Sequence, residues 1–202
     1  MRSKNTRLAD PMQVHAAALL VTSGALVELS AADARQVARH MHLQHFDAGD
    51  IVIREGETVY NDFMALVLDG EVTVENSLAA AQDSMVVSVL GPGGLIGELG
   101  LVDNEPRSAT CTAASDLLLA ILTRQAMQQL MAEKPDVAAR LLLGIAKRVA
   151  DRLRGTTRKL ITFAQVSKAL QQELDAAHSA NQRLMDLENK HPPLPTTFTG
   201  VV

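Results

Sequence analysis

The sequence predicts an α+β fold: a small, jelly-roll-like β-roll with flanking helices, followed by a long coiled-coil-like C-terminal helix. Short β-prone runs between residues 46 and 123, separated by Gly-rich corners, predict the roll. Apolar residues that keep one helical period from Asp136 to about Lys190, without a proline, predict the long helix. We therefore expect four parts: an N-terminal segment 1–29, a β-roll 30–135, a long helix 136–190 and a disordered tail 191–202.

The composition allows a packed core and excludes several classes of site. Hydrophobic residues make up 47 % of the 202 residues and charged residues 21 %, as in globular proteins. The net charge of −4 argues against binding of nucleic acid by phosphate neutralisation. Cys111 is the single cysteine, which excludes an intramolecular disulfide and any four-cysteine metal or iron–sulfur site.

The N-terminal part of the chain gives no sign of a membrane or secretory segment. No run approaches the roughly 18 uninterrupted apolar residues that a membrane helix needs. His15 and residues 22–24 interrupt the apolar stretch 14–27, whereas the hydrophobic region of a signal peptide is continuous. We expect a cytoplasmic protein with no membrane partner.

The elements before the roll are short. Residues 1–13 are polar and expected to be mobile, and residues 14–29 have helical or turn-like apolar content. Ser30, with an acid three residues later at Asp33, has the pattern of a helix N-cap and predicts a helix over 31–43.

The roll itself begins where the apolar period changes, at Phe46. Turns at 47–50 and 55–57 enclose a strand, and the β-prone runs together cover 51–53, 63–68, 71–75, 85–90, 110–112 and 117–122. The pair Asp69-Gly70 between two such runs predicts a two-residue hairpin. A helix over 124–133 follows, and Pro135 separates it from the long helix.

The long helix has the pattern of a helix that pairs with another. One heptad register places these residues at positions a and d: Ala146, Val149, Leu153, Thr156, Leu160, Phe163, Ser167, Leu170, Leu174, Ala177, Asn181 and Leu184. Nine of the twelve are apolar and the register never slips, which favours dimerisation through this helix. The alternative is an amphipathic helix that folds back on its own domain.

Residues 93–110 form the segment with the clearest chemical pattern. Gly-rich backbone leads into a short helix start at residues 97–99, where free amides bind an anion. Arg107 and Ser108 follow ten and eleven residues after Gly97, and a guanidinium and a hydroxyl that face those amides would hold a phosphate diester. Glu98 when ionised only accepts hydrogen bonds, so it calls for a donor such as a ribose 2′-hydroxyl.

This segment closely resembles the phosphate-binding cassette of the cyclic nucleotide-binding domain in the catabolite activator protein (Crp/Fnr-like) family. The family pattern is Phe-Gly-Glu-(Leu or Ile)-Ala-Leu and, a few residues later, Pro-Arg-(Ser, Thr or Ala)-Ala. The corresponding segments here are Ile96-Gly97-Glu98-Leu99-Gly100-Leu101 and Pro106-Arg107-Ser108-Ala109. The resemblance covers about residues 30–155.

The resemblance implies a role for each matching residue. Glu98 would bind the ribose 2′-hydroxyl, Arg107 and Ser108 the cyclic phosphate, and Gly97 and Leu99 would offer backbone groups. The positions that line the base pocket in the family correspond to Val87, Ser88 and Cys111, and those that cap the base to Arg152 and Leu153. The sequence departs from the family where Leu95-Ile96 replaces the usual aromatic residue and where Arg152 replaces a small hydroxyl residue, which leaves the base preference open.

Together these features predict a non-catalytic receptor for cyclic AMP, or for cyclic GMP, that forms a homodimer through its long helix and signals to an unidentified protein partner. Relatives that bind DNA place a winged helix-turn-helix after the long helix, whereas one helix-like stretch follows Lys159, so we expect no DNA partner. We expect no enzyme, because the cassette has no nucleophile–base pair. We also expect no metal, because His40 and His42 do not share a helix face.

Two alternatives remain open at this stage. The chain would be a nucleotide-free structural or oligomerisation protein if the roll were degenerate and Arg107 and Glu98 formed only a structural ion pair. It would be a DNA-binding regulator if the basic run over 147–159 contacted phosphates.

Overall fold

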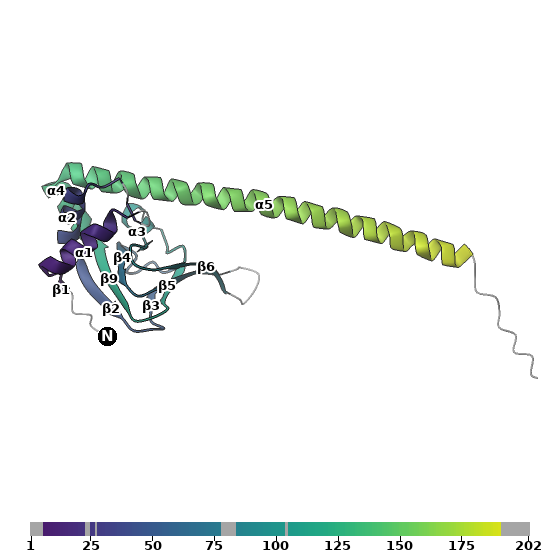
Figure 1. The fold of residues 1–202 in the computed structure, drawn as a ribbon, viewed down its shortest axis with the longest axis horizontal. Coiled ribbons are helices and arrows are strands. Elements are labelled where there is room, and N and C mark those ends of the chain that lie inside the picture. The colour runs from purple at the N-terminus through teal and green to yellow at the C-terminus, as the bar shows by residue number, and fades with distance from the viewer. Residues whose placement is uncertain (1–5, 23–24, 27, 78–83, 104, 191–202) are drawn as a thin grey trace, which may run out of the picture. The chain divides into compact units, whose positions relative to one another are not determined.

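The computed structural model describes residues 6–22, 25–26, 28–77, 84–103 and 105–190, and divides the chain into two compact units, Met1–Val149 and Ala150–Val202. The tail expected to be disordered, 191–202, lies outside the described residues. The first unit contains every strand and most of the helices, and Figure 1 shows the helices gathered beside the sheets. Among the described residues, no helix is both long and apolar enough to cross a bilayer.

Two antiparallel sheets form the roll. The first has five strands in the order β1 (Thr6–Arg7), β2 (His42–Phe46), β9 (Leu117–Thr123), β4 (Phe63–Asp69) and β7 (Leu95–Ile96). The second has four strands in the order β3 (Ile51–Ile53), β8 (Thr110–Ala113), β5 (Val72–Ser77) and β6 (Ser84–Leu90). Most neighbours in each sheet are far apart in sequence, as in a jelly roll, so the predicted fold class is confirmed.

The core has two parts, one on each face of the five-stranded sheet. Between the sheets, alternate residues of β4 and β9 such as Val67 and Leu119 pack against Val72 and Cys111 of the four-stranded sheet. On the opposite face, Met64, Leu66, Leu68 and Leu122 pack against the helices. This explains why residues 64–68 are apolar without alternation, since a strand covered on both faces buries every side chain.

Four helices cover that second face, and a fifth lies in the cassette. They are α1 (Asp10–Leu20), α2 (Ala31–Arg39), α4 (Arg124–Glu133) and α5 (Pro135–Lys190), with α3 (Leu99–Val102) in the cassette. Leu20, Val37, Leu130 and Leu141 represent the four helices in the same buried cluster. The start of α5 is therefore part of the core of the first unit.

Most predicted elements are confirmed, with two exceptions near the N-terminus. All six predicted strands are present within two residues, and the helix 124–133 and the long helix are present as expected. The helix expected over 31–43 ends at Arg39, because His42–Phe46 pair along their whole length with β9 as β2. Part of the segment expected to be mobile is ordered, since β1 and the start of α1 lie within residues 1–13 and Pro11 occupies the first turn of α1.

The hairpin expected at Asp69-Gly70 is wrong. β4 and β5 belong to different sheets and do not pair, so the two residues form a corner at which the chain passes from one sheet to the other. The type I′ hairpin turn that an Asp-Gly pair favours needs positive φ at both residues, and of these two only Gly70 has it, with φ +84°. A side chain at position 70 would also collide with the backbone carbonyl of Asp116, which makes glycine necessary there for packing as well.

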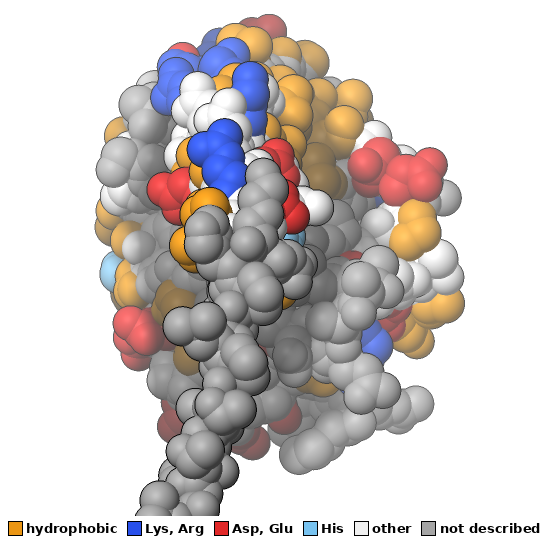
Figure 2. All heavy atoms as spheres, turned by 90° about the vertical axis from the view of Figure 1, so that its right-hand side faces the viewer, with side chains coloured by type: hydrophobic (Ala, Val, Ile, Leu, Met, Phe, Trp, Pro, Cys, Tyr) orange, Lys and Arg blue, Asp and Glu red, His pale blue; other side chains and the backbone are white. Residues whose placement is uncertain are grey.

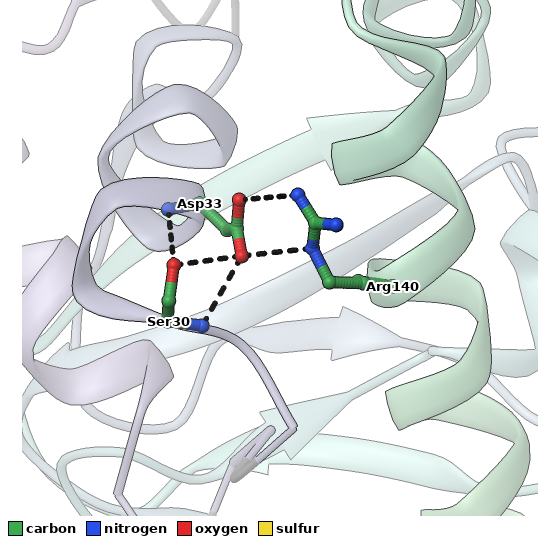
Figure 3. A network of polar contacts seen from close by, with 3 residues as sticks. All are labelled: Ser30, Asp33 and Arg140. Atoms are coloured by element: carbon green, nitrogen blue, oxygen red, sulfur yellow. Dashed lines mark hydrogen bonds and ion pairs between the residues drawn. The ribbon is translucent and has the colours of Figure 1, made fainter.

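The start of α2 is joined to α5 by a network of charged and polar groups (Figure 3). Ser30 and Asp33 form a reciprocal capping box, in which the Asp33 amide donates to the Ser30 hydroxyl at 3.1 Å. The Arg140 guanidinium donates to both carboxylate oxygens of Asp33, at 2.9 and 2.8 Å. Hydrogen bonds from Arg140 and Ser30 lower the pKa of Asp33 below its ordinary value.

The network predicts a defined dependence of stability on pH. A carboxyl whose pKa is lowered by folding stabilises the protein above its unfolded pKa of about 3.9, and this contribution is lost as the pH falls through the folded pKa. We expect Asp33→Asn to lower the thermal midpoint at pH 7, and the gap to wild type to close between about pH 4 and pH 2. Circular dichroism melts across this range test the prediction, with the exposed Asp186→Asn as control. A gap that stays constant with pH would contradict it.

Candidate functional site

Arg107 lies just before β8 and is almost completely buried, with 6 % of its surface exposed. Its Nη1 donates to the carbonyl of Gly97 at 3.0 Å, and its Nη2 donates to the carbonyl of Phe63 at 3.0 Å and, more weakly, to that of Tyr60 at 3.5 Å. The guanidinium carbon lies 4.5 Å from the centroid of the Phe63 ring, a cation–π contact. Backbone from β4, its preceding loop and the cassette thus holds the guanidinium in one orientation.

The Nε–H of Arg107 is a buried donor that has no hydrogen-bond partner among the described residues. Burial lowers the pKa of Arg107, and the nearby acidic groups, the Cys111 thiol when ionised and the carboxylates of Asp62, Glu57 and Asp103, act in the opposite direction. Leaving a buried donor unpaired destabilises the folded protein by about 1–3 kcal/mol, and by more when the donor belongs to a charged group. An oxygen of a bound anion would satisfy this donor and compensate the buried charge.

Two glycines make room for the guanidinium. Gly97 has φ +69°, and a Cβ there would lie 2.8 Å from Arg107 Nη1 and 2.9 Å from Ile53 Cδ1. A Cβ at Gly100 would collide with Arg107 Nη1 and with the carbonyl of Asn61. The cassette therefore closes around Arg107 only because these two positions have no side chain.

Glu98 is also buried, with 4 % of its surface exposed, and it lies beside α5. The Nε of Arg148 lies 4.0 Å from a carboxylate oxygen of Glu98, and Arg148 Nη2 lies 3.5 Å from the carbonyl of Leu95. Arg148 belongs to α5 within the first unit, so the cassette contacts the long helix through this residue. In the sequence, Arg148 is recognisable only as part of the basic run over 147–159; the signal that could have found it is its position one helical turn before Arg152.

A second arginine holds the cassette from the opposite end. Arg124, the first residue of α4, donates through Nη2 to the carbonyl of Gly100 at 2.6 Å and to the carbonyl of Asp103. These carbonyls lie at the C-terminal end of α3, where a helix leaves acceptors unpaired. The residue thus ties α3 to α4, and nothing in the cassette motif pointed to it.

The remaining expected site residues lie as follows. Leu99 opens α3 and Ser108 is exposed next to Arg107. Ser88 and Cys111 lie opposite Val74 on either side of β5, so all three share one sheet face, and Cys111 is buried in the core. Val87 is the extra residue at an irregularity between β5 and β6, and its side chain lies outside the described part of the structure. Arg152 and Leu153 belong to the second unit, where Leu153 is exposed on α5.

Comparison with known proteins identifies the roll. Residues 43–134, which include both halves of the cassette, match the family described as the cyclic nucleotide-binding domain. This part of the chain is a cyclic nucleotide-binding domain. It is 25 % identical over 104 residues to the CRP-like cAMP-activated global transcriptional regulator of Mycobacterium tuberculosis, a match that covers 52 % of this chain and 45 % of that regulator.

The chain is also similar to an ion channel in sequence and to a separately solved domain in fold. The chain is 32 % identical over 103 residues to a cyclic nucleotide-gated potassium channel of Mesorhizobium japonicum, covering 51 % of this chain and 26 % of the channel. In fold it is similar to the crystal structure of a cyclic nucleotide-binding domain from Methylobacillus flagellatus, with a TM-score of 0.66 and 23 % identity over 79 % of this chain and 87 % of that one. The match spans less than half the length of both curated relatives.

The close packing around Gly100 predicts that replacing it by alanine destabilises the protein, whereas the same substitution at Gly155 stabilises it. Gly100→Ala should destabilise the cyclic nucleotide-binding domain by about 1–3 kcal/mol, because the new methyl group must displace both Arg107 and the Asn61 backbone. Gly155→Ala on α5 meets nothing within 4 Å and should stabilise its helix by about 0.5–1 kcal/mol. Urea unfolding followed by circular dichroism measures both, and equal effects of the two substitutions would refute the close fit.

Proposed function

We propose that this chain is a non-catalytic receptor for a cyclic mononucleotide, cyclic AMP or cyclic GMP, that signals through α5 to a protein partner. The observation that carries the proposal is the buried guanidinium of Arg107, with Nε–H unpaired among the described residues and glycines packed around it. A cyclic phosphate supplies the missing acceptor and one negative charge. Ser108, next to Arg107 and exposed, would donate a further hydrogen bond to the phosphate.

Glu98 and the sheet supply the other contacts of the proposed ligand. An ionised carboxylate is an acceptor only, so Glu98 would take the hydrogen of the ribose 2′-hydroxyl. Gly97 and Leu99 would contribute backbone groups, and Val87, Ser88 and Cys111 would line the base. The names of the regulator and the channel above support a cyclic nucleotide as the ligand.

The contact between Glu98 and Arg148 offers a route from the ligand to α5. When Glu98 accepts a hydrogen bond from a ligand hydroxyl, its carboxylate interacts with both the hydroxyl and Arg148. The ion pair between Glu98 and Arg148 of α5 is thereby altered. Such a ligand shifts α5 only by its difference in affinity between two arrangements of the helix. The capping of the base by Arg152 and Leu153 remains a prediction from the family resemblance.

The second unit supports a homodimer as part of the same proposal. The large hydrophobic side chains at the a and d positions beyond residue 150 are more than half exposed: Leu153, Leu160, Phe163, Leu170, Leu174 and Leu184. Figure 2 shows hydrophobic side chains at the molecular surface beside Lys and Arg side chains. A hollow on α5 is lined by Phe163, Val166, Ser167, Leu170, Gln171 and Leu174, residues at positions a, d, e and g. In a parallel paired helix such residues form the holes that receive side chains of a second copy.

Calorimetric titration with cyclic AMP and cyclic GMP tests the receptor. We expect saturable binding of one of them, and a loss of about 2–5 kcal/mol, or about 30-fold or more in affinity, in Arg107→Ala, because the phosphate loses its buried partner. Arg35→Ala, on the exposed face of α2, is the matched control and should bind as wild type does.

Three further arms make the outcome decisive. The 2′-deoxy analogue of the ligand should bind about tenfold or more weakly, because Glu98 then has no hydroxyl to accept. Thermal midpoints of both arginine variants separate lost binding from lost folding. A well-folded wild-type protein that binds neither mononucleotide, nor a cyclic dinucleotide, would rule out the receptor and leave oligomerisation through α5 as the function.

A pair of substitutions on α5 tests the dimer. Leu170→Glu places two like charges in the proposed seam and should weaken self-association by about 100-fold or more. Ile161→Glu introduces the same charge at an apolar residue of similar exposure outside the a and d positions, and should leave self-association unchanged. Sedimentation equilibrium distinguishes the two, and a monomeric wild-type protein at all concentrations would contradict the proposal.

A further inference from the structure

Tyr60, in the loop before β4, has an unusual backbone conformation. Its φ of +60° is positive, and it is the one non-glycine residue with positive φ among the described residues. This left-handed region is unfavourable for a bulky side chain, and such strain persists only when surrounding contacts impose it. The Tyr60 side chain is 77 % exposed, so packing of the ring in the core does not compensate for the strain.

The contacts that impose this conformation converge on Arg107. The Gly56 amide donates to the Arg107 carbonyl at 2.8 Å, and the Arg107 amide donates to the Glu57 carbonyl at 3.0 Å. Further along the loop, the carbonyls of Tyr60 and Phe63 accept from Nη2, and the Phe63 ring lies under the guanidinium.

Asn61 anchors the loop from its other side. Its side chain is buried, with 6 % of the residue exposed, and donates to the carbonyl of Glu105 at 3.1 Å. Glu105 lies two residues before Arg107, so the loop is attached both to the arginine backbone and to the chain just before it. The segment 56–63 thus encloses the backbone and the head group of Arg107.

We propose that Tyr60 is a positioning residue for anion binding, acting through its backbone conformation and not through its ring. The φ angle of a residue places its carbonyl carbon relative to the preceding chain, and ψ then turns the carbonyl oxygen, so a change of φ moves the carbonyl. At +60° the Tyr60 carbonyl points toward Nη2, and the chain then brings the Phe63 carbonyl to the same nitrogen. Both Nη groups therefore donate to protein carbonyls, whereas Nε–H has no partner among the described residues and is available to a phosphate oxygen.

The effect of Tyr60 on binding rests on the proposed receptor function. The effect of Tyr60 on the position of the Arg107 side chain does not depend on which ligand binds. Two substitutions separate the backbone of Tyr60 from its ring. Tyr60→Gly removes the ring and adopts φ +60° without strain. Tyr60→Val also removes the ring, but a β-branched residue is a severe outlier at that angle. Val59→Ala, at the neighbouring exposed residue, is the control for a surface change in this loop.

The first measurement is made on the ligand-free chain of 202 residues by ¹⁵N NMR of arginine Nε–H groups, with the Arg107 signal assigned through Arg107→Lys. A buried Nε–H should give a resolved, slowly exchanging signal in wild type, Tyr60→Gly and Val59→Ala. We expect the signal to shift and exchange faster in Tyr60→Val. The same signal in Tyr60→Val as in wild type would overturn the proposal.

The second measurement is the affinity for cyclic AMP and cyclic GMP, with thermal midpoints as the folding control. Tyr60→Gly should bind within about threefold of wild type, and Tyr60→Val about tenfold or more weakly, the size expected from strain of this kind. Equal affinities of these two variants would overturn the link to binding. A changed NMR signal in Tyr60→Val with no binding by wild type would support the positioning role and refute the proposed receptor instead.

Discussion

The arrangement of the cassette depends on the burial of one positive charge. Arg107 is almost inaccessible, yet most of its compensation comes from neutral carbonyls and an aromatic ring. Carbonyl dipoles stabilise a guanidinium only if several approach it closely, which requires glycine at positions 97 and 100 and a strained backbone at Tyr60. The local sequence of three separate segments thus follows from the need to solvate one side chain without water.

Three further arginines join the cassette and the helices around it. Arg124 ties the end of α3 to α4, Arg148 brings α5 to Glu98, and Arg140 ties α5 to the start of α2. Planar guanidinium groups suit this task, because one side chain reaches two acceptors in fixed directions. The part of α5 that belongs to the first unit is therefore held to the rest of that unit at more than one point, through Arg140 and Arg148.

Short segments of the sequence predicted most of the helices and strands, but not which strands pair with each other. The capping pattern at Ser30 and Asp33 and the strands with dense apolar residues were recognisable, because local hydrogen bonds and burial periodicity determine them. The pattern at Asp69-Gly70 suggested a hairpin but marks a corner between sheets, since local propensity does not say which strand pairs with which. The strand β2 was missed for the same reason, because its partner β9 lies more than seventy residues further along the chain.

The candidate site also has features that the sequence predicts and features that only the tertiary structure shows. The sequence by itself determined the fold class, the position of the cassette and the residue types able to bind a phosphate diester, because glycines, a carboxylate and a guanidinium at this spacing carry that chemistry. Only the tertiary structure decided that Nε is the unpaired donor of Arg107, that Arg148 contacts Glu98, and that Tyr60 has a left-handed backbone. Each of these depends on atoms from segments remote in sequence, whose approach is set by the packing of two sheets and four helices.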